Sequence, residues 1–227
     1  LLQSPVLYLN GHGRMPFVGQ PGELLSVPEK QLQKYVDEGG FILAEACCGD
    51  EEFAASFRLL MKRIFPKSDL RRLPETHAIW TAFFKDEGLA QFAGLEGLEK
   101  GCRTVVVFSP KPLAGYWEEQ RFMPRPGQAP AKAGDVTHRG EMSYKLAGNV
   151  IAYATGLEPP KPKLSVTKIY DPKADAGPTR GVFKVAQLKT LGGDAEPAPA
   201  AMRNLMSHLR EKTGLDVSLK KESYFPG

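Results

Sequence analysis

Long hydrophobic runs are absent from this 227-residue sequence. No uninterrupted apolar stretch approaches the ~20 residues that a membrane-spanning helix needs, and no charged-then-apolar signal segment opens the chain. Residues Leu1 to Pro5 lead straight into a predicted strand. We therefore expect a soluble domain excised from a longer protein, either cytoplasmic or exported to a periplasm. The parent protein is a candidate for a membrane anchor outside this sequence.

Cysteine is also scarce. Only three cysteines are present, and two of them, Cys47 and Cys48, are adjacent. This number does not make a disulfide framework, and neighbouring cysteines rarely bridge each other because the geometry is strained. The count fits a reducing compartment and equally an exported protein without disulfides.

A basic surface stripe is a third absence. The formal net charge is +4, and residues 157–227 hold that whole excess, with 12 Lys/Arg against 8 Asp/Glu. The lysines there follow a Pro-rich stretch and do not alternate with aromatic residues. This pattern argues against nucleic-acid binding and favours a solvated linker.

What the sequence does contain is an alternation of short apolar runs and amphipathic segments. Buried strands are predicted at residues 6–9, 41–44 and 104–108, and helices at 26–39, 50–64 and 140–155. Ser26 and Glu29 have the spacing of a capping box, and Asp50 is a predicted N-cap. The alternation is typical of βαβ units and a parallel sheet, which makes the chain an α/β protein.

The rest of the chain divides into three parts. Residues 110–138 read as a long loop that contains Tyr116 and Trp117, and residues 157–177 as a Pro/Lys-rich linker after a main domain at 1–156. Residues 178–227 then predict a strand at 182–188, a helix at 197–213 and a strand at 215–219. One βαβ unit cannot bury both faces of its strands alone. We expect it to complete the main sheet, in its own chain or by swapping with a neighbour.

Several motifs resemble a bacterial family catalogued as domain of unknown function 4159. They are Leu7–Gly13, Tyr35–Gly49, Ser56–Pro66, Leu73–Ile79 and Gly148–Ala154. Members of that family open with a strand, a helix and a second strand before the Gly-His-Gly turn. Here that opening is missing from the front, whereas residues 183–217 resemble it. The resemblance implies a parent with tandem copies and a first βαβ unit permuted to the C-terminus, completed within one chain or in a domain-swapped homodimer.

The family is similar to class I glutamine amidotransferase-like domains, including the trehalose-utilisation type. This similarity implies a flavodoxin-like, Rossmann-like sheet with helices on both faces. Ligands of such sheets bind beyond the carboxyl ends of the strands. His12 with its flanking Gly11 and Gly13 falls there, as does the segment 45–50, and Gly193 would reach the same end after the strand at 182–188.

The segment Glu45-Ala46-Cys47-Cys48-Gly49 resembles the Gly-x-Cys-x-Gly nucleophile elbow of amidotransferases. The resemblance makes Cys47 the candidate nucleophile, with His12 and Glu45 as the other candidate catalytic residues. Glu45 replaces the first glycine of the motif, and no histidine of the chain has the His-x-Glu pattern. Small, buried and inert cysteines are the competing interpretation.

A polar-ligand site is the second candidate. His12, Glu45, Cys48, Asp50 and His77 are residue types that also bind metals, but no pair has the close spacing of a zinc motif. We therefore predict no metal, and no cofactor, because the glycine pairs near residues 11 and 193 complete no nucleotide motif. The predicted ligand-binding residues are Gly11, Gly13, Cys48, Asp50, His77 and Gly193.

These observations favour an amidotransferase-like domain that has no catalytic activity and binds a small polar ligand or a partner protein. The alternative is a cysteine- or metal-dependent hydrolase of a small amide or sugar-like substrate. In a third interpretation the domain is an assembly module whose 178–227 unit pairs between chains.

Overall fold

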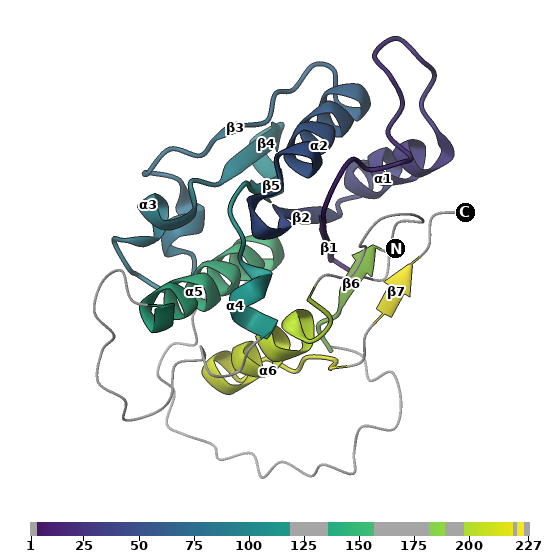
Figure 1. Ribbon diagram of the computed structural model, residues 1–227. Coiled ribbons are helices and arrows are strands. Elements are labelled where there is room, and N and C mark those ends of the chain that lie inside the picture. The colour runs from purple at the N-terminus through teal and green to yellow at the C-terminus, as the bar shows by residue number, and fades with distance from the viewer. Residues whose placement is uncertain (1–3, 119–135, 157–181, 189–197, 220–221, 225–227) are drawn as a thin grey trace.

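The computed structural model describes residues 4–118, 136–156, 182–188, 198–219 and 222–224 (Figure 1). Its strands form one seven-stranded sheet in the order β3-β4-β5-β2-β1-β6-β7. The strands are β1 (Val6–Gly11), β2 (Phe41–Ala46), β3 (Arg71–Arg72), β4 (Glu96–Lys100), β5 (Arg103–Ser109), β6 (Val185–Leu188) and β7 (Glu222–Tyr224). The predicted linker at 157–177 lies outside the described residues.

Helices come between most of these strands along the chain. They are α1 (Val27–Asp37), α2 (Glu51–Ile64), α3 (Leu89–Ala93), α4 (Ala114–Glu118), α5 (Val136–Thr155) and α6 (Ala201–Thr213), with single helical turns η1 (Cys47–Gly49) and η2 (Ala78–Thr81). The predicted capping box at Ser26 and the Asp50 N-cap are both confirmed. Within the described ranges, no helix combines the length and apolar character that crossing a membrane requires.

The centre of the sheet is parallel, as predicted. β1 pairs in parallel with β2 on one side and with β6 on the other, β2 pairs with β5, and β6 with β7. Every residue of β1 and β2 is buried. Strands covered on both faces explain why the sequence shows continuous apolar runs instead of alternation.

The sheet departs from the predicted parallel pairing on the side of β5 that faces away from β2. β4 pairs antiparallel with β5, and the short β3 pairs antiparallel with β4. The sequence does not predict β4, because its residues, Glu-Gly-Leu-Glu-Lys, include a single large apolar side chain, that of Leu98. Its place next to β5 is set by tertiary pairing and not by an apolar pattern.

Two helical layers cover the two faces of the sheet (Figure 1). Helices α1 and α2 enclose one core, which contains Leu7, Leu9 and Ile42. Helices α3 to α6 enclose the other, which contains Tyr8, Leu43 and Trp117. Because side chains alternate along a strand, neighbouring residues of β1 and β2 contribute to opposite cores.

Trp117 corrects the prediction that residues 110–138 form one long loop. It lies in the short helix α4 and is fully buried in the core. Its carbonyl oxygen accepts a hydrogen bond of 2.6 Å from Asn204 of α6. The loop prediction was wrong at residues 114–118, because Pro and Gly near Trp117 hid a helix of about one and a half turns. Residues 119–135 of the predicted loop lie outside the described residues.

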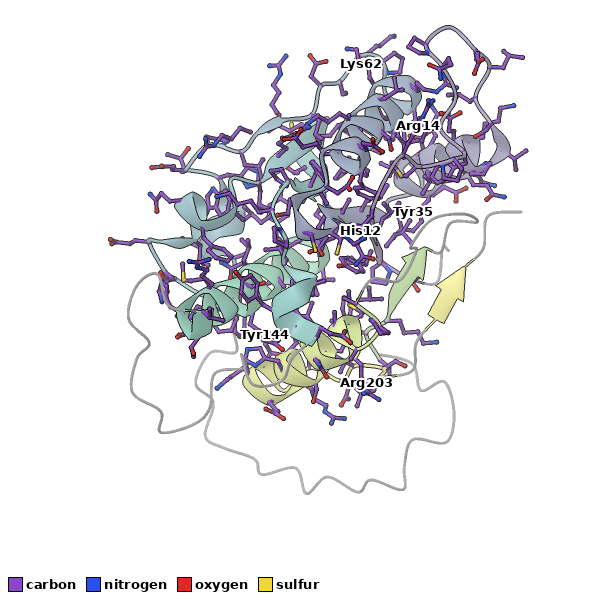
Figure 2. The ribbon with its side chains drawn as sticks, in the orientation of Figure 1. His12, Arg14, Tyr35, Lys62, Tyr144 and Arg203 are labelled. Carbon is purple, nitrogen blue, oxygen red and sulfur yellow. The ribbon has the colours of Figure 1, made fainter. Side chains whose placement is uncertain are left out.

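The C-terminal unit packs on the sheet of its own chain. β6 lies beside β1, and α6 packs against α4 and α5. The predicted strand at 215–219 is reduced to one bridge between Val217 and Phe183, and the regular pairing with β6 comes later, at β7. Between α5 and α6 the ring centroids of Tyr144 and His208 lie 4.7 Å apart. Figure 2 labels Tyr144.

The stability of this α5–α6 contact should depend on pH through His208. Burial, and secondly the charge of Lys212, lower the pKa of His208 to about 4 from an ordinary value near 6.5. The stabilisation is therefore complete above pH 6.5 and is lost as the pH falls toward 4. Between these pH values we expect the free energy of unfolding of wild type to fall by roughly 3 kcal/mol more than that of His208→Phe. This variant keeps a ring against Tyr144. Urea denaturation of both proteins at pH 7 and pH 4 measures this, and equal losses would contradict it.

Candidate functional site

The site lies where the two central strands end. β1 and β2 run in parallel, and their last residues, Gly11 and Ala46, are paired. His12 and Cys47 follow these residues directly, so the parallel register places the two side chains at the same edge of the sheet. Figure 2 shows His12 at the end of β1.

The turn after β2 has an unusual backbone. Cys48 has φ 54° and ψ 13°, and among the described residues other than glycine it alone has a positive φ. Gly49 follows with φ 75°. A side chain in the left-handed region is uncommon, and such strain occurs mainly where a structure uses it. The consequence here is that two consecutive cysteines point to the same side of the chain.

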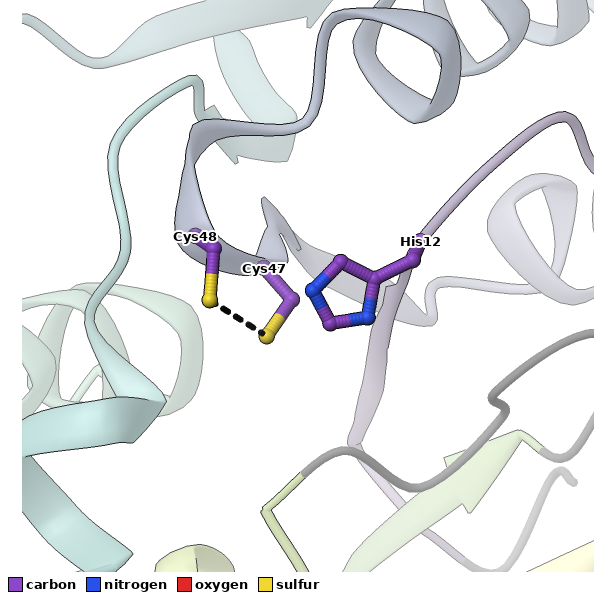
Figure 3. Close-up of side chains that lie close together, drawn as sticks. All are labelled: His12, Cys47 and Cys48. Atoms are coloured by element: carbon purple, nitrogen blue, oxygen red, sulfur yellow. Dashed lines mark hydrogen bonds between the residues drawn. The ribbon is translucent and has the colours of Figure 1, made fainter.

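The three donor atoms of His12, Cys47 and Cys48 lie together. The two sulfur atoms are 3.8 Å apart, and a ring nitrogen of His12 and both sulfurs all lie within 4.8 Å of one another. Figure 3 shows the imidazole facing both sulfurs. Cys47 is buried, His12 is half-buried and Cys48 is exposed. The exposed thiol is therefore that of Cys48, whereas the sequence motif favoured Cys47 as the nucleophile.

Asp50 fixes the two turns relative to each other. One of its carboxylate oxygens, Oδ1, accepts hydrogen bonds from the backbone N–H of Phe53 at 2.7 Å and of Gly13 at 3.1 Å. The first caps helix α2 and the second holds the turn that bears His12. Asp50 thus positions the predicted site, and Gly13, with φ 66°, supplies a backbone donor.

Glu45 lies in β2, two residues before Cys47, and is completely buried. Its carboxyl oxygens accept hydrogen bonds from the N–H groups of Leu113 and Ala114, at 2.9 to 3.1 Å. These donors are the ones that the start of helix α4 leaves without intrahelical partners. Burial raises the pKa of Glu45 to about 8, against the lowering effect of these bonds. In this position Glu45 links β2 to α4, and it is mostly protonated at neutral pH.

Tyr8 is the neighbour of this carboxyl group that sequence reasoning missed. Burial first, and then the Glu45 charge, raise the pKa of Tyr8 well above its usual value. The Tyr8 hydroxyl interacts with the Glu45 carboxyl, and this interaction contributes to the pKa shifts of both groups. Within the described residues the buried indole N–H of Trp117 has no hydrogen-bond partner, and the ring centroids of Tyr8 and Trp117 lie 6.1 Å apart. Tyr8 and Asn10 are two residues apart in β1, so their side chains lie on the same face of the sheet. Asn10 pairs with Glu45 of β2, which places Tyr8 and Glu45 on that same face. This spacing is the sequence signal that could have revealed Tyr8.

The remaining predicted residues are not all brought together. His77 caps the turn η2 by accepting from Ile79 N–H, and its other nitrogen lies 2.9 Å from the Thr104 hydroxyl. Thr104 is near the start of β5, whereas the site lies at the carboxyl ends of the strands. His77 therefore lies at the opposite end of the strands from the site. Burial lowers its pKa. Gly193 lies outside the described residues.

Comparison with known proteins places the chain in a family. The family described as "Domain of unknown function (DUF4159)" matches residues 1–155. The chain belongs to this family. No curated protein matches the chain. In this DUF4159 domain the matched range includes His12, both adjacent cysteines and Glu45, whereas β6, β7 and α6 lie beyond it.

The buried Glu45 of this DUF4159 domain should make its stability fall as the pH rises. The carboxyl pKa is about 8 in the fold against 4.5 ordinarily, so the stabilisation is complete below pH 4.5 and is lost as the pH approaches 8. In Glu45→Gln the amide oxygen accepts from the same N–H groups and the side chain cannot ionise. Between pH 5 and pH 8 we expect the free energy of unfolding of the variant to rise by roughly 3 kcal/mol or more relative to that of wild type.

Urea denaturation at the two pH values measures this gain. Glu75→Gln is the matched control, because Glu75 is exposed and its replacement should leave the pH dependence unchanged. Parallel pH profiles for wild type and Glu45→Gln would contradict the prediction.

Proposed function

We propose that this domain binds a small polar ligand at the carboxyl edge of the sheet, over the turns that bear His12 and Cys48. The observation that carries the proposal is the convergence of an imidazole and two thiols, all within 4.8 Å, at that edge. A partly exposed imidazole and an exposed thiol can both hydrogen-bond to a ligand. Ligands of open α/β sheets bind beyond the carboxyl ends of the strands, and both turns lie there, at the ends of β1 and β2.

Strand order supports a flavodoxin-like interpretation of the fold, with its first unit permuted. If β6 and β7 are counted as the first two strands and β1, β2 and β5 as the next three, the sheet order β7-β6-β1-β2-β5 becomes 2-1-3-4-5. This is the flavodoxin-like order, whose switch point lies between strands 1 and 3. In this chain those strands are β6 and β1, and His12 directly follows β1. The class I amidotransferase-like relationship is part of the same proposal.

The contacts of Glu45 favour binding over catalysis. Both of its carboxyl oxygens accept backbone N–H groups, and burial keeps it largely protonated. Asp50 is engaged in the cap of α2 and in the Gly13 contact. The hydrogen bonds described for both acids go to backbone N–H groups, whereas the third member of a catalytic triad hydrogen-bonds to the base.

Ligand binding should appear as a rise in the melting temperature. We expect at least one class in a panel of amino acids, small amides, sugars and sugar phosphates to stabilise wild type by about 5 °C at saturating concentration. His12→Ala and Cys48→Ala should lose that rise. Cys102→Ala is the matched control, because Cys102 is an exposed cysteine beside the start of β5, at the opposite edge. A panel without effect, or an equal rise in His12→Ala, would reject the proposal.

A cysteine-dependent hydrolase of a small amide is the second candidate, and the exposed Cys48 favours it. There His12 would accept the thiol proton and the sulfur would attack the carbonyl carbon. The C–N bond would then break as His12 gives the proton to the leaving amine, which leaves a thioester. Water would hydrolyse the thioester to the acid and the free thiol. The rate of alkylation by iodoacetamide at pH 7 separates the two functions. A nucleophilic Cys48 should react at least about tenfold faster than Cys102 and slow down in His12→Ala. Similar rates for the two cysteines would reject the hydrolase and leave ligand binding as the one proposed function.

A further inference from the structure

We propose that His12, Cys47 and Cys48 bind one zinc-like metal ion through an imidazole nitrogen and two thiolates. The inference rests on the ligand site of the proposed function and names the group that would hold the ligand there. Sequence spacing did not predict it, because the donors come from two turns that are distant along the chain and adjacent in the sheet. From the sequence we predict no metal, and the metal-binding residue types considered there include His12 and Cys48 but not Cys47.

The spacing of the donor atoms fits a tetrahedral ion. With Zn–S near 2.3 Å and Zn–N near 2.1 Å, two sulfurs should be about 3.8 Å apart, and a sulfur and a nitrogen about 3.6 Å. The two sulfurs are 3.8 Å apart, and no pair of donors exceeds 4.8 Å. A rotation of the His12 ring that moves its nitrogen by about 1 Å would complete the arrangement.

The types of donor select the metal. Thiolates and imidazole suit zinc and other thiophilic ions, whereas magnesium and calcium require oxygen ligands. Two thiolates also neutralise a divalent cation, so burial of Cys47 would cost little once the ion is bound. Binding releases the two thiol protons to solvent, and affinity should therefore rise with pH.

The backbone holds the donors in advance. The two cysteines share the short turn η1, in which Cys48 has a positive φ, and their sulfur atoms lie 3.8 Å apart. The Asp50 contact with Gly13 N–H fixes the neighbouring turn, so His12 cannot drift from the cysteines without breaking it. Supporting contacts of this kind are what orient the ligands of metal sites.

The gradient of exposure indicates where a substrate or ligand would reach the ion. Cys47 lies inside, and Cys48 lies on the solvent side. Three protein ligands leave the fourth tetrahedral position for water or a polar ligand, as in catalytic zinc sites. The small polar ligand of the proposed function would then bind the metal directly through an oxygen or nitrogen atom.

Cobalt titration tests the site. The reduced 227-residue chain, freed of metal by a chelator, is titrated with Co²⁺ near neutral pH. We expect one ion per chain, a thiolate-to-cobalt charge-transfer band, strong visible bands of a tetrahedral complex, and displacement by one equivalent of Zn²⁺. Cys48→Ser and His12→Ala should bind about 100-fold more weakly or worse, and Cys102→Ser should match wild type. Circular dichroism confirms that each variant is folded; Cys48→Ser keeps a small side chain at an exposed position.

Three results would overturn the metal site. They are an absence of the charge-transfer band in reduced wild type, an unchanged band in Cys48→Ser and His12→Ala, and loss of the band in Cys102→Ser. The ligand panel is run on both the metal-free and the metal-loaded chain, so that the two proposals can fail separately. Cobalt binding with a panel that is inactive on both forms would reject the small-ligand proposal and keep the metal, and a positive panel without cobalt binding would do the reverse.

Discussion

Parallel pairing of β1 with β2 is the constraint on which the rest of this structure depends. Helices cover both strands on both faces, and the pairing places Gly11 opposite Ala46. The side chains that follow each strand must then emerge at one edge, within reach of each other. A register shift of one residue would exchange the two cores and separate His12 from Cys47.

Two acids, one near the surface and one buried, stabilise the structure around the carboxyl ends of these strands. Asp50 lies at the surface of the turn and joins the His12 turn to helix α2. Glu45 lies inside and joins β2 to helix α4, where burial raises its pKa to about 8. Each acid satisfies backbone N–H groups that the start of a helix leaves unpaired. Neither acid therefore needs to take part in chemistry to explain its position.

The fold was predictable where local pattern and tertiary packing agree. Ser26 and Asp50 cap the expected helices, and the apolar runs at β1, β2 and β5 form the parallel centre. Prediction failed where packing overrides pattern. The polar β4 is a strand because β5 offers it an edge, and Trp117 lies in a helix held by Glu45 and Asn204.

The sequence by itself determined the α/β class, the helix caps and the edge of the sheet at which polar side chains would gather. These follow from local propensity and from the rule that parallel strands align their ends. Only the tertiary structure decided that Cys48 is exposed, that its sulfur lies 3.8 Å from that of Cys47, and that His77 lies at the opposite edge. The reason is physical: backbone dihedrals in one turn, and distances between residues remote in sequence, are set by the whole packed sheet.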